Sequence, residues 1–139
     1  MRHALLLVSA LLLMACAKAA SSHPVIIAHT EAFNAKDVTA MGRVEHPDIE
    51  WFSVSGSEIS TEVSGRDNLA EMMAGYFKGS PSVTATLRDW SINGDYISVT
   101  ETAAWTTKDG AEKSQSSLSV YQLEDGLIRR VWYYPAQND

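Results

Sequence analysis

The chain has 139 residues, of which 45% are hydrophobic and 20% are charged, so it is long enough for one globular domain with a single core. Its net charge is −6, and its lysines and arginines form no cluster. A nucleic-acid-binding protein needs a basic stripe to displace the counterions of the phosphates, so the composition argues against nucleic acid as a partner.

The first residues, MRHALLLVSALLLMACAKAASS, have the form of an export signal. Arg2 supplies a basic start, and the apolar run over Ala4–Ala15 is too short to span a bilayer comfortably. The segment is therefore predicted to direct export and to lie outside the fold.

The end of this run, Leu-Met-Ala-Cys, resembles a bacterial lipoprotein box. The resemblance implies removal of residues 1–15 and attachment of lipid to Cys16, with 16–22 as a flexible tether. It implies a lipid-anchored protein of the cell envelope, on the periplasmic face of the outer membrane in a Gram-negative host. The alternative is an ordinary secretory signal cut near Ala20. Since Cys16 is the only cysteine, no internal disulfide can form.

Two helices are expected to open the domain. Ile26, His29 and Phe33 recur at helical spacing, which predicts a helix over 23–35. Asp37 then has the position of an N-cap, and it predicts a short second helix.

The middle of the chain predicts strands followed by a third helix. His46–Asp48 is expected to form a turn, and Ile49–Val54 a short strand. A further small strand is expected over Glu58–Val63. The apolar spacing within 65–79, with Gly79 at its end, predicts a helix.

The last third of the chain is predicted to be an antiparallel meander. Turns that contain glycine separate four apolar-alternating runs, Ser82–Asn93, Tyr96–Thr107, Glu112–Leu123 and Leu127–Tyr134. Helices come early and strands come late, so the fold class is α+β.

Four stretches, AFNAKDVTAM, HPDIEWFS, SGRDNLAEMMAGYF and VYQLEDGLIRRVWYY, together resemble the SnoaL-like members of the nuclear transport factor 2-like superfamily. The resemblance implies that residues 23–136 form one cone-shaped domain. In such a cone, a strongly bent antiparallel sheet wraps around three helices and encloses an apolar pocket.

On this resemblance, eight side chains are expected to line the pocket: His29, Phe33, Trp51, Ser53, Tyr76, Tyr121, Trp132 and Tyr134. Arg130, Trp132 and Tyr134 alternate along the last strand. That pattern suits a concave sheet face with polar handles on apolar walls. The alternative for the two aromatic residues is a place in the core or in a dimer interface, and for Arg130 a solvated or interfacial place.

The catalytic residues of known relatives are missing at the matching positions. Ser53 stands where a ketosteroid isomerase-like relative would carry its carboxylate base, and a serine hydroxyl is too weak a base for that task. The acid/base set of epoxide hydrolase-like relatives is also absent. His29 and Glu101 remain as the candidate catalytic residues, although a lone histidine on an apolar helix face is more often part of the core.

Two arguments about Glu101 conflict. Strand alternation places Glu101 on the apolar face of Val99 and Ala103, where burial would raise the pKa of its carboxyl. The family alignment instead turns Thr100 and Thr102 toward the pocket. We expect Glu101 on the outer face, paired with an arginine, Arg88 or Arg130.

The sequence therefore predicts an exported protein that binds a small, largely apolar molecule in the cone. One alternative is an isomerase, cyclase or hydrolase that uses the same pocket. Another is an interaction module with a vestigial pocket. A homodimer through the outer sheet face is expected. No cofactor motif is present, and His46, Asp48 and Glu50 lack the spacing of a zinc site, so neither cofactor nor metal is expected.

Overall fold

The computed structural model describes residues 22–138, so the expected signal (1–15) and nearly all of the tether (16–22) lie outside the described residues. The elements are α1 (Pro24–Asn34), α2 (Val38–Gly42), β1 (Glu45–Ser55), β2 (Glu58–Ser64), α3 (Arg66–Gly79), β3 (Thr84–Asn93), β4 (Tyr96–Thr106), β5 (Glu112–Glu124), β6 (Leu127–Tyr133) and β7 (Gln137–Asn138). None of the helices in this part of the chain is long and apolar enough to cross a membrane.

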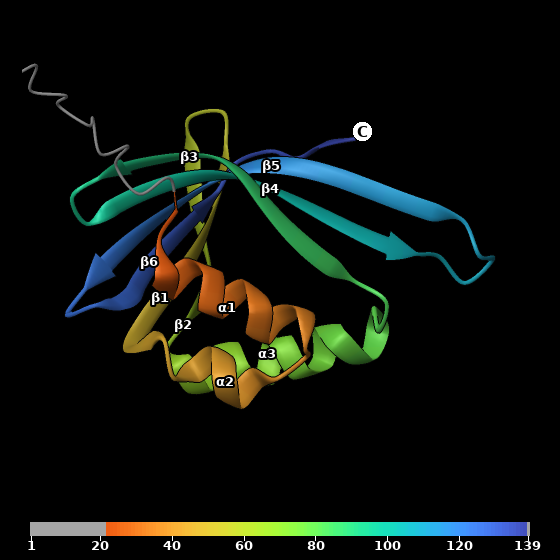
Figure 1. The fold of residues 1–139 in the computed structure, drawn as a ribbon, viewed down its shortest axis with the longest axis horizontal. Coiled ribbons are helices and arrows are strands. Elements are labelled where there is room, and N and C mark those ends of the chain that lie inside the picture. Colours follow the sequence, from red (N-terminus) through yellow and green to blue (C-terminus); the bar gives the residue numbers. More distant parts are fainter. Residues whose placement is uncertain (1–21, 139) are drawn as a thin grey trace, which may run out of the picture.

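The strands form one curved sheet in the order β2-β1-β6-β5-β4-β3, with β7 paired to β5. Figure 1 shows the sheet arching over the three helices, which lie together on its concave side. This arrangement confirms the predicted α+β cone. One pair departs from the antiparallel expectation, because β1 and β6 run parallel. The first strand of the chain is thereby joined to the last long one.

The helices begin where the sequence supplies caps. At α1, His23 Nδ1 accepts a hydrogen bond from the Val25 backbone N–H, and Pro24 occupies the first turn. At α2, the Asp37 side chain accepts from the Ala40 N–H at 2.9 Å, as predicted. The two helices therefore begin within a residue of the predicted positions.

The end of α1 is fastened to the edge strand β3. The side-chain amide of Asn34 donates to the Ala85 carbonyl at 2.9 Å and accepts from the Ala85 N–H at 2.7 Å. One side chain thus satisfies both backbone groups of a residue on an edge strand, groups that otherwise lack a neighbouring strand.

β1 is longer than predicted, and the expected turn at His46–Asp48 is wrong. Those residues lie within the strand, in a stretch where its pairing with β6 is interrupted between Glu45 and Glu50. Proline has no N–H to donate to a ladder, so Pro47 fits where the ladder is broken. Sequence signals for a turn and for a strand irregularity are alike at such a proline.

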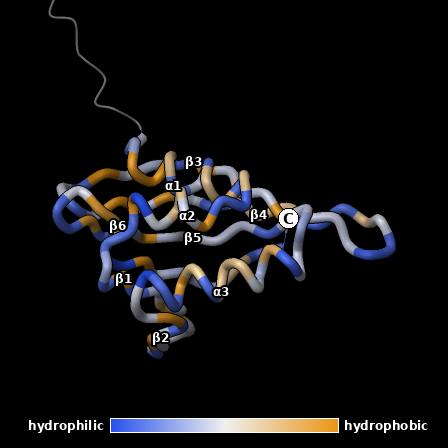
Figure 2. The backbone as a smooth tube through the Cα atoms, turned by 90° about the horizontal axis from the view of Figure 1, so that it is seen from below, coloured by the Kyte–Doolittle hydropathy of each residue, from blue (hydrophilic) through white to orange (hydrophobic). Residues whose placement is uncertain are grey.

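The core fills the space between the helices and the concave sheet face. The helices contribute Ile26, Met41, Leu69, Met73 and Phe77, and the sheet contributes Ile49, Ile97, Val99, Tyr121, Ile128 and Val131. The β4–β5 turn, in contrast to this apolar core, projects beyond the helices and is mostly hydrophilic (Figure 2).

Candidate functional site

A cavity of about 300 Å³ opens between the helices and the concave face of the sheet. Its lining is mostly apolar and aromatic: His29, Thr30, Phe33, Trp51, Met72, Met73, Tyr76, Ala85, Glu101, Ala103, Gln115, Ser117, Tyr121 and Tyr133. Met72 and Tyr76 are 38% and 43% exposed, so the α3 side forms the mouth. The lining contains no lysine or arginine, and the cavity therefore suits an uncharged molecule.

Glu101 lies inside this cavity, so the expectation that it faces outward is wrong. Ile97 and Val99 are fully buried in the core, and Glu101 follows them at alternate positions of β4. The register of β4 with β5 runs without a break from Tyr96 to Thr106, so the alternation is preserved along the whole strand. Local periodicity was the better guide here than the family alignment.

Thr100 and Thr102, which the family alignment turned toward the pocket, belong to the opposite face of β4. The Thr102 hydroxyl is 2.8 Å from that of Ser116, which alternates with the pocket residues of β5. Neither expected arginine contacts Glu101. Arg130 donates through Nε to Glu50 at 3.0 Å, and Arg88 pairs with its neighbour Asp89.

Strand β6 turns toward the pocket the face opposite to the one expected from the sequence. Tyr133 lines the cavity, whereas Trp132 stacks on Phe52 with ring centroids 5.6 Å apart and Tyr134 is 40% exposed. The prediction that Trp132 and Tyr134 line the pocket is therefore wrong. Alternation along β6 was predicted correctly, but it does not say which set faces inward. The burial of Val131, two positions before Tyr133, decides it.

Ser53 is likewise absent from the lining. Its hydroxyl is 3.0 Å from that of Ser60 and donates to Glu62, both on the neighbouring strand β2. Of the eight side chains expected to line a pocket, those that line this cavity are His29, Phe33, Trp51, Tyr76 and Tyr121.

The polar centre of the pocket is Glu101. The Tyr121 hydroxyl donates to Glu101 Oε2 at 3.1 Å. Burial raises the pKa of the Glu101 carboxyl, while the Tyr121 hydrogen bond, the charge of His29 and the Ser119 hydroxyl oppose the rise. Ser119 Oγ lies near enough for this effect, although it makes no hydrogen bond of standard geometry within residues 22–138.

Three tyrosine hydroxyls surround this carboxyl. Burial raises the pKa of Tyr121 and of Tyr133 well above the usual value, and the nearby negative charge of Glu101 raises both further. At the mouth, burial and then the same charge raise the pKa of Tyr76. All three hydroxyls therefore keep their protons near neutral pH and can serve as hydrogen-bond donors.

His29 stands on the helical wall and forms a buried pair with Glu45. His29 Nε2 is 2.8 Å from Glu45 Oε1, and the two residues are 4% and 1% exposed. Glu45 does not line the cavity, so it lies behind the histidine. Sequence reasoning missed Glu45, because a charged residue at the start of a strand gives no signal of burial.

Trp51 completes the inner wall. Its ring lies edge-on to those of Tyr133, at 5.3 Å between centroids, and His29, at 6.4 Å. Its Nε1 is buried and has no hydrogen-bond partner among residues 22–138, so the indole contributes to the site as an apolar surface.

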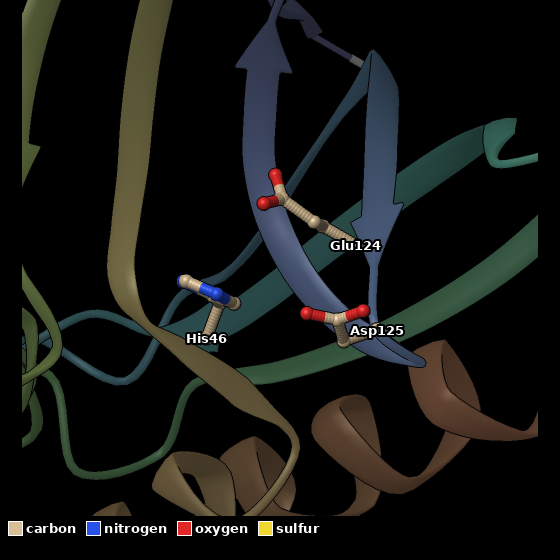
Figure 3. A group of neighbouring side chains, drawn as sticks. All are labelled: His46, Glu124 and Asp125. Carbon is tan, nitrogen blue, oxygen red and sulfur yellow. The ribbon is translucent and has the colours of Figure 1, made fainter.

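A second cluster of ionisable groups lies outside the cavity. Figure 3 shows His46 on β1 beside Glu124 and Asp125 at the β5–β6 turn, with possible ligand atoms within 4.8 Å of one another. His46 Nδ1 accepts from the Asp48 N–H at 3.1 Å, so the neutral ring carries its proton on Nε2. Such an Nε2 donates to carboxylates rather than binding a metal.

Two further contacts argue against a metal in this region. Glu124 Oε2 already faces Arg129 Nε at 3.6 Å, which supplies a positive charge. Glu50 is engaged by Arg129 and Arg130, each at 3.0 Å, and so is not free to join His46. We therefore assign no metal to His46 with Glu124 and Asp125, or to His46 with Glu50.

The bent sheet, the three helices on its concave side and the cavity between them define a small α+β protein of the cone type. The family model of the SnoaL-like domain matches residues 26–131, so the chain belongs to the SnoaL-like family. Among curated proteins, none matches the sequence of this chain.

Solved structures show the same fold at low sequence identity. A cystatin-fold protein from Novosphingobium aromaticivorans is 20% identical, with a TM-score of 0.68 over 78% of this chain and 93% of that one. Wild-type IdmH, a putative polyketide cyclase from Streptomyces antibioticus, is 20% identical, with a TM-score of 0.66 over 83% and 89%. A putative SnoaL-like polyketide cyclase from Jannaschia sp. is 13% identical, with a TM-score of 0.66 over 81% and 83%.

Proposed function

We propose that the protein binds a small, largely apolar carbonyl compound in the cone and moves a proton on it. The observation that carries this proposal is the Glu101–Tyr121 hydrogen bond inside an otherwise apolar cavity. A carboxyl whose pKa is raised by burial in an apolar pocket is an arrangement that general acids use. The enzyme alternative is therefore favoured over simple binding.

The polar groups divide into donors and an acceptor. With its proton retained, Glu101 donates to the carbonyl oxygen of the substrate, and the hydroxyl of Tyr121 supports Glu101 from the side. His29 lies on the facing wall and removes the proton from the carbon next to the carbonyl. The electron pair of the broken C–H bond forms the new C=C bond, and the π pair of the carbonyl moves to its oxygen. That oxygen takes the proton of Glu101, so the product is an enol, Glu101 is left as a carboxylate and His29 holds the proton taken from carbon.

The enol can then react in two ways, and neither needs a cofactor. Return of the proton to another carbon of a conjugated system gives an isomer. Attack of the enol carbon on a second carbonyl of the same molecule closes a ring, as a cyclase does: the enol proton returns to Glu101, the first carbonyl re-forms, and the oxygen of the second carbonyl takes the proton held by His29. Two of the structural relatives are described as putative polyketide cyclases, which supports this reaction class.

The test uses 2-tetralone, a neutral bicyclic ketone, in D2O. The protein is expected to exchange the protons next to the carbonyl for deuterium at least tenfold faster than buffer alone, as followed by proton NMR. His29→Gln and Glu101→Gln should each lower the exchange rate at least tenfold, because each removes one of the two groups that move the proton. Ser53→Ala, outside the cavity, serves as the matched control.

Binding without exchange would contradict the catalytic proposal and would return the protein to the class of small-molecule binders. Exchange that survives both His29→Gln and Glu101→Gln would place the chemistry elsewhere. Absence of both binding and exchange would overturn the proposed ligand class.

We further propose that the outer sheet face joins two copies of the chain. Phe52 and Trp132 stack on that face, and Leu118 and Tyr134 are 45% and 40% exposed close to them, since the Tyr134 N–H donates to the Leu118 carbonyl. Large apolar side chains grouped in this way favour association.

We also propose that lipid on Cys16 anchors the domain to the cell envelope. The support is the sequence resemblance described above, with its Leu-Met-Ala-Cys ending. Expression of wild type and Cys16→Ser in a bacterial host fed a labelled fatty acid tests this anchor. Label in the wild type alone is the expected result, and an unlabelled wild-type protein would favour ordinary secretion.

A further inference from the structure

We propose that Glu45 is the positioning residue of the site, which holds His29 so that Nδ1 is its proton-accepting nitrogen. This inference rests on the proposed function, because it assigns the state in which His29 would act. It concerns a residue that neither the sequence pattern nor the family resemblance singled out.

The first support is the burial of the pair. Glu45 is 1% exposed, and its side chain hydrogen-bonds His29 Nε2 at 2.8 Å. Burial of a carboxylate costs several kcal/mol unless it is paired, and a pair of apolar side chains of similar size would stabilise the core at least as well. Packing alone therefore does not account for a histidine and a glutamate at these positions.

The second support is the chemistry of the contact. In the proposed arrangement Glu45 is the ionised partner; an ionised carboxylate can only accept hydrogen bonds, so the proton between the two side chains is assigned to His29 Nε2. In the neutral ring the lone pair then lies on Nδ1. Within residues 22–138, Nδ1 has no hydrogen-bond partner. It is thus the ring nitrogen left for a bound molecule.

The third support is the position of Glu45 relative to the cavity. His29 lines the cavity and Glu45 does not, so the carboxylate contacts the base but not the substrate. A base oriented by a third group behind it is the arrangement that activates proton acceptors in unrelated enzymes. When Nδ1 takes a proton, the positive ring remains beside a negative carboxylate and no unpaired charge is created in the core.

The groups around His29 agree with this role. The ionisable side chains placed about the cavity by the other elements are Tyr76 of α3, Glu101 of β4, Tyr121 of β5 and Tyr133 of β6. Burial raises the pKa of all four, so each favours its neutral form. Among residues 22–138, the carboxyl group within hydrogen-bond distance of the His29 ring is that of Glu45, at 2.8 Å.

The direct test is the tautomer of His29 in the purified wild-type protein. Nitrogen-15 NMR at pH 8.5 distinguishes a protonated from a bare ring nitrogen, and the spectrum of His29→Gln assigns the signals. We expect His29 to carry its proton on Nε2. A proton on Nδ1 would overturn the proposal even if exchange of 2-tetralone is observed.

The variant test uses Glu45→Gln, with Glu50→Gln as the matched control. Glu50 is on the same strand and is also paired, but with Arg129 and Arg130 outside the cavity. Glu45→Gln should lower the Nε2-protonated fraction of His29, because an amide can donate as well as accept. It should also lower kcat for 2-tetralone exchange about 10- to 100-fold while KM changes less than about twofold. Glu50→Gln should change none of these values.

An unchanged kcat in Glu45→Gln, with a folded protein, would also overturn the proposal. If Glu45→Gln does not fold, the wild-type tautomer remains decisive, and Glu45→Asp provides a carboxylate withdrawn from the ring. The tautomer is measured without substrate, so its result is separate from that of the proposed function. If His29 carries its proton on Nε2 but 2-tetralone does not exchange, the proposed reaction is refuted, whereas Nδ1 remains the proton-accepting nitrogen.

Discussion

Tyr121 and Glu101 meet although they are not partners in the sheet. The register pairs Tyr121 with Ile97 and Glu101 with Ser117, yet the Tyr121 hydroxyl donates to Glu101 Oε2 at 3.1 Å. The two side chains must therefore extend along their strands toward each other on the concave face. This diagonal contact brings the Tyr121 hydroxyl of β5 to the Glu101 carboxyl of β4.

Tyr121→Phe removes this contact with little change in volume. The Tyr121 hydrogen bond lowers the pKa of the Glu101 carboxyl, so its loss should raise that pKa further. The variant should also lose about 1 kcal/mol of unfolding free energy. A carboxyl-selective NMR titration and urea unfolding measure the two effects. Tyr96→Phe, at a half-exposed position of the same sheet, should show neither effect.

The stability of the protein should depend on pH through Glu101. Burial raises the pKa of this carboxyl in the folded state, so the folded state binds the proton more tightly than the unfolded chain does. The contribution to stability is present at pH values below the unfolded pKa and is lost as the pH rises through the folded pKa.

Glu101→Gln removes that titration. The variant should gain stability relative to wild type as the pH rises from about 4, the usual pKa of a glutamate carboxyl, toward the raised pKa of the folded state. Urea midpoints measured for both proteins across this range provide the test. A difference that does not change with pH would show that Glu101 titrates alike in the folded and unfolded chains.

His29→Ala should be more damaging than an ordinary truncation. It leaves the Glu45 carboxylate buried without its partner, at an expected cost of about 3–5 kcal/mol in unfolding free energy. His29→Leu combined with Glu45→Met removes both charges and should recover most of that loss. If the double variant is no more stable than His29→Ala, the single loss reflects packing rather than an unpaired charge.

The sequence predicted the architecture because each element carries a local signal. Turns with glycine separated the strands, and the spacing of Leu69, Met73 and Phe77 revealed the buried face of α3. The site was harder to predict. Period-two alternation sorts strand residues into two sets, but only the tertiary structure shows which set faces the helices. Tyr133 was therefore missed, and Trp132 was placed on the wrong side.

Glu45 shows the limit more clearly. Its burial depends on His29, sixteen positions earlier in the chain, and on the parallel pairing of Glu45 with Ile128. No window of neighbouring residues contains that information. The alternation along β4 did group Glu101 with the apolar Ile97 and Val99, since β4 has no irregularity that would shift its faces relative to β5, but the family alignment pointed to the other face.

Asn34→Ala should loosen the edge of the sheet. The change removes two hydrogen bonds and leaves both backbone groups of Ala85 without a side-chain partner, so we expect a loss of about 1–2 kcal/mol. Asn68→Ala, which removes one exposed bond to the Ser64 carbonyl, is the control and should cost less. Hydrogen exchange of the Ala85 amide should accelerate in Asn34→Ala and stay unchanged in Asn68→Ala.

Leu118→Glu tests the proposed pairing of two chains. A charge at the centre of the outer face should shift the protein from dimer to monomer, because an unpaired buried charge opposes association. Ile92→Glu is the control: Ile92 is 41% exposed near the end of β3, and its partner across the sheet is the buried Ile97, so it belongs to the opposite face. Sedimentation of wild type and both variants gives the answer. A wild-type monomer at all concentrations would reject the dimer.

The parallel pairing of β1 with β6 also governs when the molecule can fold. Arg129 and Arg130 contact Glu50 across 79 and 80 positions of the chain, so the sheet joins its first strand to its last long one. Contacts of such separation form late, because a long loop must close before they contribute. A ribosome must therefore release nearly the whole polypeptide before the sheet can be completed, and until then the chain remains available to chaperones and translocation machinery.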